Sequence, residues 1–219
     1  SELLARMANN EKISFAEIDE IISTRSVVDP MANTDAITIF YSGEPEYMIN
    51  TIVDNCDGDV RIIRRTQAFD FVADPYVEKI VKYVVAIENP NWDATAIQNE
   101  VNIRFYEASS YDTNANKVQG KGYWTEISRR FAAETTGDAY SLCSNAKGDR
   151  IYAMDELPTW LDNVEDSAQM GGYTKAELIS MGREEAFYNV KQWTKQDLGQ
   201  SVVYYDAQGK VGQTFSNTS

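Results

Sequence analysis

The sequence predicts an α/β fold in which an N-terminal helical segment, residues 1–35, packs on a small, mostly parallel sheet within a domain of residues 36–219. A β-branched and aromatic run at 36–41 and an apolar run at 60–63 flank a segment with helical spacing, which is the strand–helix–strand order of a parallel sheet. The composition supports a folded globule, because 43% of the residues are hydrophobic and 25% are charged. A chain of 219 residues is long enough to bury a core.

Helices are predicted where capping signals precede apolar residues at helical spacing. Ser14 and Glu17 form a capping box, which predicts a helix over 15–24. Apolar residues at 48–53 predict a helix between the first two strands. Asp74-Pro75 begins a further helix, which ends at Asn89-Pro90.

The second half of the chain alternates in the same way. Val101 to Tyr106 is predicted as a strand, and the polar, glycine-rich stretch 109–122 as a loop or lid. An amphipathic helix follows at 123–133, with Gly137 as its stop signal. The remaining predicted elements are a strand at 138–143, a turn at 144–148, a helix from the capping box at 174–177 to about Trp193, and a strand at 202–205 before a turn at 206–209.

The charge balance excludes some partners. With 20 basic and 34 acidic residues the net charge is −14, and the longest basic runs are Arg64-Arg65 and Arg129-Arg130, so no nucleic-acid partner is expected. The chain has no stretch of 18 apolar residues, so no membrane span is expected. The acidic charge fits either a solubility role or the steering of a basic partner.

The absence of histidine excludes much catalytic chemistry. Ser-His-Asp and Cys-His catalysis, HExxH zinc sites and a histidine general base cannot operate within this chain. Cys56 and Cys143 cannot form a zinc site alone; they could form one disulfide or stay as buried thiols. No metal site is predicted. The candidate reactive groups are therefore carboxylates, tyrosines, serines and lysines.

Glu156 is the strongest candidate among the carboxylates. A useful carboxylate lies beside aromatic residues at a strand end, where burial controls its charge. Glu156 follows an apolar run that contains Tyr152, and Pro158 and Trp160 come soon after it. The alternative is an ordinary glutamate at a helix N-terminus, which the helix dipole favours.

Two further candidates come from aromatic residues next to turns. Trp124 opens an amphipathic helix, where it lines a site or serves as a core residue. Tyr41-Ser42-Gly43 follows the first strand, at the sheet edge where α/β proteins bind ligands and backbone N–H groups hold phosphates. The alternative for this tripeptide is an ordinary turn.

Two sequence islands resemble the ADP-ribosyl cyclase/NAD glycohydrolase family. Tyr-Trp-Thr-Glu-Ile-Ser-Arg-Arg-Phe-Ala at 123–132 resembles the family's Phe-Trp-x-x-Val-Ser-Arg-Arg-Phe-Ala segment. Tyr-Ala-Met-Asp-Glu-Leu-Pro at 152–158 resembles a run, aromatic, three residues, Glu-x-Pro, found in the family's cysteine-poor bacterial toxin and fungal relatives. The resemblance implies an ADP-ribosyl cyclase-like fold.

The resemblance also implies roles for individual residues. Glu156 matches the catalytic glutamate, and Trp124 matches the tryptophan that lines the nicotinamide pocket. Tyr41 takes the place of a second pocket aromatic, within a strand-end motif completed by Ser42 and Gly43. Ser128 and Tyr152, like Ser42, fall where the family contacts the pyrophosphate and ribose.

One position departs from the family pattern. Arg64 stands where the family has a second pocket glutamate, which influences whether the reaction intermediate cyclises or meets water. Its loss puts cyclisation in doubt more than hydrolysis, and an arginine there is suited to bind a phosphate of the substrate.

The activity that the resemblance implies is NAD(P) glycohydrolysis, giving nicotinamide and ADP-ribose with minor cyclase activity. NAD or NADP is then a substrate, and no cofactor is required. Relatives of this kind are NAD-depleting toxins that are secreted or delivered into the cytoplasm of a target cell and are inhibited by an immunity protein. The alternatives are an ADP-ribosyltransferase toxin and a degenerate member that binds a nucleotide or a partner without catalysis.

Overall fold

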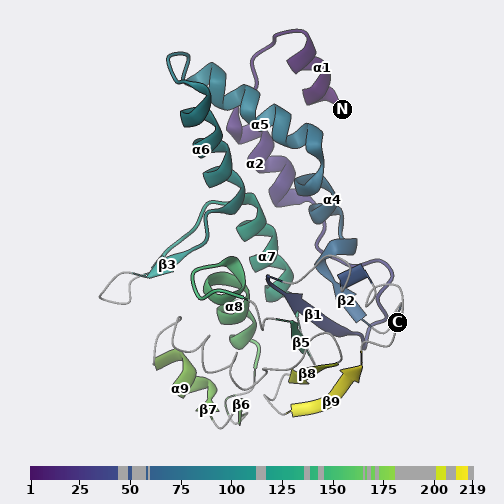
Figure 1. Cartoon of the computed structure of the whole chain (residues 1–219). Helices are drawn as coiled ribbons and strands as arrows, with labels where there is room; N and C mark the ends of the chain where they lie inside the picture. Colours follow the sequence, from purple (N-terminus) through teal and green to yellow (C-terminus); the bar gives the residue numbers. More distant parts are fainter. Residues whose placement is uncertain are drawn as a thin grey trace.

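The protein is a mixed α/β molecule that is mostly helical. The computed structural model describes residues 1–43, 49–50, 58, 60–111, 117–135, 139–142, 146–164, 166, 169–170, 173–180, 201–205 and 211–216. The long helices gather at one end of the molecule and the main sheet lies at the other (Figure 1). Helix α7 runs from the helical end towards the sheet (Figure 1).

Capping side chains mark where several helices begin. In α2 the Glu17 carboxylate accepts a hydrogen bond from the backbone N–H of Ser14 at 2.9 Å, which confirms the predicted start at residue 15. In α5 the Asp74 carboxylate accepts from the N–H of Tyr76 at 2.9 Å, as predicted. The helical elements with their bounds are α1 (Glu2–Ala8), α2 (Phe15–Thr24), η1 (Ile63–Arg65), α4 (Gln67–Ala73), α5 (Pro75–Glu88), α6 (Ala94–Tyr106), α7 (Tyr123–Ala133), η2 (Tyr152–Glu156), α8 (Leu157–Leu161) and α9 (Lys175–Ser180).

The predicted strand at 101–106 is wrong, because this segment forms the last turns of helix α6. Val101, Ile103 and Phe105 alternate with polar residues, which imitates a strand. In the helix, Val101 and Phe105 lie four residues apart on the buried face, whereas Ile103 is 47% exposed. Asp93 caps the helix by accepting from the N–H of Ala96 at 2.8 Å.

The main sheet has the strand order β2-β1-β5-β8-β9 among the described strands. Strand β1 pairs in parallel with both β2 and β5, so the predicted parallel pairing of the first two strands is confirmed. Strands β8 and β9 join antiparallel, so the sheet is mixed rather than mostly parallel. The strand bounds are β1 (Ile37–Tyr41), β2 (Val60–Ile62), β5 (Ala139–Leu142), β8 (Ser201–Tyr205) and β9 (Val211–Ser216).

The predicted loop at 109–122 contains a short hairpin. Strand β3 (Ser110–Tyr111) pairs antiparallel with β4 (Lys117–Val118). A second small hairpin pairs β6 (Gln169–Met170) with β7 (Tyr173–Thr174). The capping box before α9 forms as predicted, since the N–H of Glu177 donates to the Thr174 hydroxyl at 3.2 Å and the N–H of Thr174 donates to the Glu177 carboxylate at 3.3 Å.

One hydrophobic core unites the N-terminal helices with the sheet. Ile18 and Ile22 of α2 belong to the same buried cluster as Phe40 of β1 and Phe131 of α7. The rings of Phe40 and Phe131 meet edge to face, with centroids 6.1 Å apart. The core therefore fixes α7, which carries part of the candidate site, against β1.

Several predictions fall outside the described residues. These are most of the helix at 48–53, Cys56 and Cys143, Gly137, residues 144–145 of the turn at 144–148, the helix beyond residue 180 and the turn at 206–209. In the part of the chain that the structure does describe, no helix has the length and apolarity needed to cross a membrane.

Candidate active site

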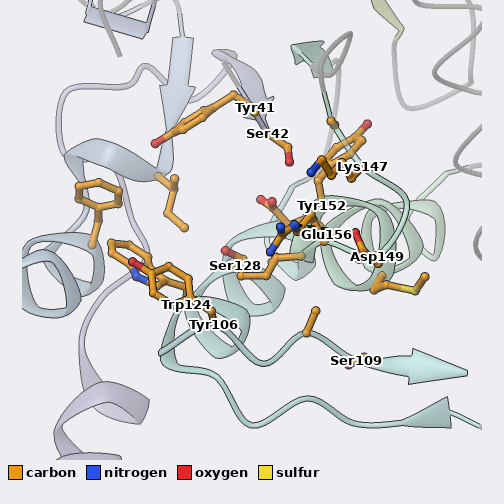
Figure 2. A pocket seen from close by; sticks show the side chains of 18 of the residues that line it. Tyr41, Ser42, Tyr106, Ser109, Trp124, Ser128, Lys147, Asp149, Tyr152 and Glu156 are labelled. Atoms are coloured by element: carbon orange, nitrogen blue, oxygen red, sulfur yellow. Dashed lines mark ion pairs between the residues drawn. The ribbon is translucent and has the colours of Figure 1, made fainter. Parts of the chain in front are cut away.

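A pocket of about 1150 Å³ opens between the end of β1, helices α4 and α7, the turn η2 and the β3 side of the first hairpin. Figure 2 shows side chains from these separate elements converging on it. It is lined by all eight residues that the sequence predicted as site residues, which are Tyr41, Ser42, Gly43, Arg64, Trp124, Ser128, Tyr152 and Glu156. Folding thus brings together positions that are more than 100 residues apart.

Helix α7 presents one face to the pocket and another to the core. Trp124 and Ser128 are four residues apart and line the pocket, whereas Ile127 and Phe131 are fully buried in the core. The indole of Trp124 packs against the ring of Phe69 from α4, with centroids 5.0 Å apart and planes inclined by 58°. This contact orients the indole, so Trp124 serves both of its predicted roles, as packed residue and as pocket lining.

Glu156 lies in a π-helical turn rather than at a strand end. The N–H of Leu157 donates to the carbonyl of Tyr152, which is the wide spacing of a π turn. Pro158 explains the widening, because its ring has no N–H and would clash with a carbonyl in a regular α turn. Glu156 directly precedes α8, into which η2 continues without a break, and its side chain makes no capping hydrogen bond while the residue lines the pocket.

The Glu156 carboxyl is largely buried and faces the pocket. The residue is only 7% exposed, and no hydrogen bond or ion pair to its carboxyl occurs among the described residues. Burial, and secondarily the neighbouring charge of Asp155, raises the pKa of Glu156 to about 8. Figure 2 shows the carboxyl turned into the pocket, above Ser128 in this view. A buried carboxyl with a shifted pKa in a pocket is the kind of group that enzymes use for chemistry.

The end of β1 forms the opposite part of the lining. Tyr41, Ser42 and Gly43 lie at the carboxyl end of a strand that is parallel to both of its neighbours. Gly43 has a φ of 72°, a left-handed conformation that glycine adopts without a steric penalty. The chain thereby turns sharply after Ser42, which leaves Tyr41 and Ser42 facing the pocket (Figure 2).

Tyr152 forms a rigid wall of the site. Its hydroxyl lies 2.6 Å from the hydroxyl of Ser141 on β5, and its ring packs near that of Phe40 at 6.2 Å between centroids. The residue is almost fully buried. These contacts tie η2 to the sheet, so Tyr152 holds the turn that carries Glu156.

The sequence did not single out several other lining residues. Phe69 and Tyr106 add aromatic surface beside Trp124, and Lys147 and Arg150 add cations to the one supplied by Arg64. Arg150 is paired with Asp149 at 3.8 Å and is largely exposed. The charge-rich run 147–150 could have indicated these cations, but no local signal points to Phe69, which reaches the site only through the packing of α4 on α7.

Within the described ranges, no group of three or more carboxylate or thiolate side chains is placed to hold a metal ion. Comparisons of the chain with protein-family models, with curated proteins and with solved structures found no match. The family resemblance of the two sequence islands therefore remains a prediction.

Proposed function

We propose that the chain is an NAD(P) glycohydrolase that cleaves the bond between nicotinamide and ribose. Water adds to the ribose carbon C1′, the C1′–N bond breaks, and the products are nicotinamide, ADP-ribose or its 2′-phosphate, and one proton. The observation that carries the proposal is that Glu156 and Trp124 line one pocket. The described part of the pocket contains a carboxylate, an aromatic face and cations, and the reaction needs no histidine.

The reaction requires stabilisation of a cation more than it requires proton transfer. Nicotinamide leaves with the bonding electrons and becomes neutral, so no general acid is needed. The ribose is left as an oxocarbenium-like cation, which an adjacent carboxylate stabilises electrostatically or traps covalently. Glu156 is suited to this role because its low exposure reduces screening of its charge.

The raised pKa of Glu156 fits the charge of the substrate. In the empty pocket a pKa of about 8 keeps much of the population protonated at neutral pH. The pyridinium ring of NAD is cationic, so its arrival favours the ionised carboxylate and lowers that pKa. Substrate binding is then coupled to loss of the proton, and the ionised carboxylate is present when the sugar cation forms.

The aromatic and cationic linings fit the remaining parts of a dinucleotide. Trp124, backed by Phe69, offers an aromatic face for a cationic ring. Arg64 and Lys147 line the same pocket and supply charge complementary to phosphates. The volume of about 1150 Å³ is at the upper end of small-molecule sites, as a dinucleotide requires.

The test is a product analysis with purified protein and NAD or NADP. We expect equimolar nicotinamide and ADP-ribose, or its 2′-phosphate, by chromatography. A cyclic product without free ADP-ribose would indicate a cyclase, and label transferred to added proteins would indicate a transferase. Binding of NAD without release of nicotinamide would contradict the proposal and favour a non-catalytic nucleotide-binding role.

A further inference from the structure

We propose that Asp155 is a positioning residue that, together with Arg129 and Ser109, fixes one wall of the pocket and regulates the charge of Glu156. The inference builds on the proposed function, since it gives Asp155 a part in the same site. It rests on a buried network beneath the pocket that connects η2, α7 and the segment that leads into β3.

Asp155 is the centre of this network. Its side chain is fully buried and accepts three hydrogen bonds. The backbone N–H of Ser109 donates to one oxygen at 2.9 Å, and the Ser109 hydroxyl and Nη1 of Arg129 donate to the other at 2.5 Å and 3.2 Å. A buried carboxylate bonded in this way is held in one orientation, because any lost partner leaves a buried charge uncompensated.

A second layer of contacts extends the network to the far side of the hairpin. The N–H of Gly120 donates to the Ser109 hydroxyl at 3.0 Å, and Nη1 of Arg129 also donates to the Gly120 carbonyl at 3.2 Å. A Cβ at Gly120 would lie 2.3 Å from the carbonyl oxygen of Glu107, so only glycine permits this approach. The two segments that flank the hairpin are therefore clamped to each other and to α7.

The clamped segment is part of the pocket. Ala108, Ser109 and Ser110 all line it, beside Tyr106 and Trp124. The position of this wall is set by hydrogen bonds to Asp155, which belongs to the same helical turn as Glu156. One buried carboxylate thus fixes the distance between the wall and the neighbouring Glu156 carboxyl.

The same arrangement couples the charges. The anion of Asp155 raises the pKa of Glu156, in addition to the larger effect of burial. Arg129 on α7 pairs with Asp155 at 3.2 Å, so we expect its cation to offset part of that field. Among the described residues, the other titratable groups that face the pocket are Tyr41 from β1, Arg64 from η1, Tyr106 from α6, Lys147, Asp149 and Arg150 from the segment before η2, and Tyr152 from η2 itself.

The two charged partners should therefore have opposite effects on Glu156. Asp155→Asn removes an anion and lowers the pKa of Glu156, whereas Arg129→Gln removes a cation and raises it. A purely structural role would not produce shifts of opposite sign. Asp35→Asn is the matched control, because it removes one carboxylate from an exposed position outside the pocket.

The titration can be followed without any enzymatic activity. The free energy of unfolding is measured against pH for each protein with and without Glu156→Gln, and the difference within each pair reports the Glu156 titration. In the parent pair we expect the difference to change between pH 4.5 and about 8. The upper end of this pH range should move down in the Asp155→Asn pair and up in the Arg129→Gln pair. It should not move in the Asp35→Asn pair.

Hydrogen exchange tests the clamp separately. In Asp155→Asn the amides of Ser109 and Gly120 should exchange about tenfold faster or more, the scale of one hydrogen bond to a charged group. Ser109→Ala removes hydroxyl contacts without a change of charge, so it should speed exchange at Gly120 and leave the Glu156 titration unchanged. Amides of β1 should keep their protection in both variants.

Unchanged titration limits in both charge variants, or unchanged exchange at Ser109 and Gly120, would overturn the inference. These measurements judge it whether or not the protein hydrolyses NAD. If nicotinamide is released, the pH midpoint of kcat/KM should move in the same direction as the Glu156 titration in each variant. Shifts that appear in unfolding but not in the rates would place Asp155 outside the catalytic site and so overturn its role there.

Discussion

Glu156 and Asp155 are neighbours in the chain whose carboxyl groups meet opposite environments. Asp155 is buried with three hydrogen-bond donors, whereas Glu156 is buried facing a pocket with no such partner among the described residues. Consecutive residues of a helical turn point in different directions, so Asp155 faces Ser109 and Arg129 whereas Glu156 faces the pocket. One carboxylate is therefore suited to structure and the other to chemistry.

The pH dependence of activity should report the ionisation of Glu156. Only the ionised carboxylate stabilises the sugar cation, and its pKa in the free protein is raised to about 8. We therefore expect kcat/KM for NAD to rise with pH and reach a plateau above about 8. The midpoint for kcat should lie at lower pH, because the bound pyridinium favours the ionised form. A flat profile from pH 6 to 9 would rule out this assignment.

The stability of the protein should respond to the same group with a definite sign. The pKa of Glu156 is 4.5 in the unfolded chain and about 8 in the folded protein, so ionisation at rising pH favours unfolding. The stability that the neutral carboxyl contributes is complete below pH 4.5 and is lost by about pH 8. Glu156→Gln should thus become more stable than the parent by a few kcal/mol above pH 8, as measured by urea denaturation. Equal stability at all pH values would contradict the burial of this group.

Trp124 should contribute binding through its aromatic face. Trp124→Ala removes the face, and we expect kcat/KM for NAD to fall about 10- to 100-fold, the scale of one lost stacking contact. Trp124→Phe should recover part of the loss, since a smaller ring retains stacking. Trp92→Ala is the control, because Trp92 is 43% exposed and does not line the pocket. Equal losses in the Trp92 and Trp124 variants would show a general effect on folding instead.

At the scale of elements, local signals predicted a helix where a cap and an apolar face fall within the same segment. The start of α2 and the whole of α5 could be predicted because Ser14, Glu17, Asp74 and Pro75 act within one turn. Helix α6 was mistaken for a strand because its apolar residues at 101, 103 and 105 alternate with polar ones. Only the first and the last of these three, four residues apart, are buried in the helix. Packing decided between the two patterns, and packing is not visible in a short window of sequence.

In the site, the family resemblance and the end of the first strand together gave the eight residues that line the pocket. Their meeting in one pocket depends on the parallel pairing of β1 with β5 and on the packing of α7. Asp155 and Phe69 could not be predicted as parts of the site. Their partners, Ser109 and Trp124, are about 50 residues away in the chain and are brought near only by the fold.

The hairpin element depends on one glycine that the sequence marked only as part of a loop. At Gly120 a Cβ would meet backbone atoms of Glu107 and Ala108 at 2.3 Å, and backbone cannot move aside cheaply. Gly120→Ala should therefore destabilise the protein by about 1–3 kcal/mol in urea denaturation. Lys121→Ala, at the exposed next position, should have little effect. A neutral Gly120→Ala would show that the two segments do not pack as closely as described.

At the scale of the whole molecule, the fold is a helical body with the sheet at one end (Figure 1). Both parts line the pocket, since residues of β1 and of helices α4 and α7 contribute to it. The core joins α2, β1 and α7 into one cluster, so the walls of the pocket are supported from behind. The net charge of −14 contrasts with a pocket in which three basic side chains, Arg64, Lys147 and Arg150, outnumber the two acidic ones, Asp149 and Glu156, among the described residues. This distribution is consistent with an acidic protein that accepts an anionic dinucleotide at one place.

The most direct test compares nicotinamide release by the parent protein, Glu156→Gln and Glu126→Gln in saturating NAD at a pH above 8. Glu126 lies on α7 two residues from Trp124, is partly exposed and does not line the pocket, so its variant controls for the loss of one carboxylate from this helix. We expect Glu156→Gln to release nicotinamide about 10²- to 10³-fold more slowly than the parent, with Glu126→Gln near the parent rate. A Glu156→Gln protein that turns over NAD at the parent rate would contradict the account.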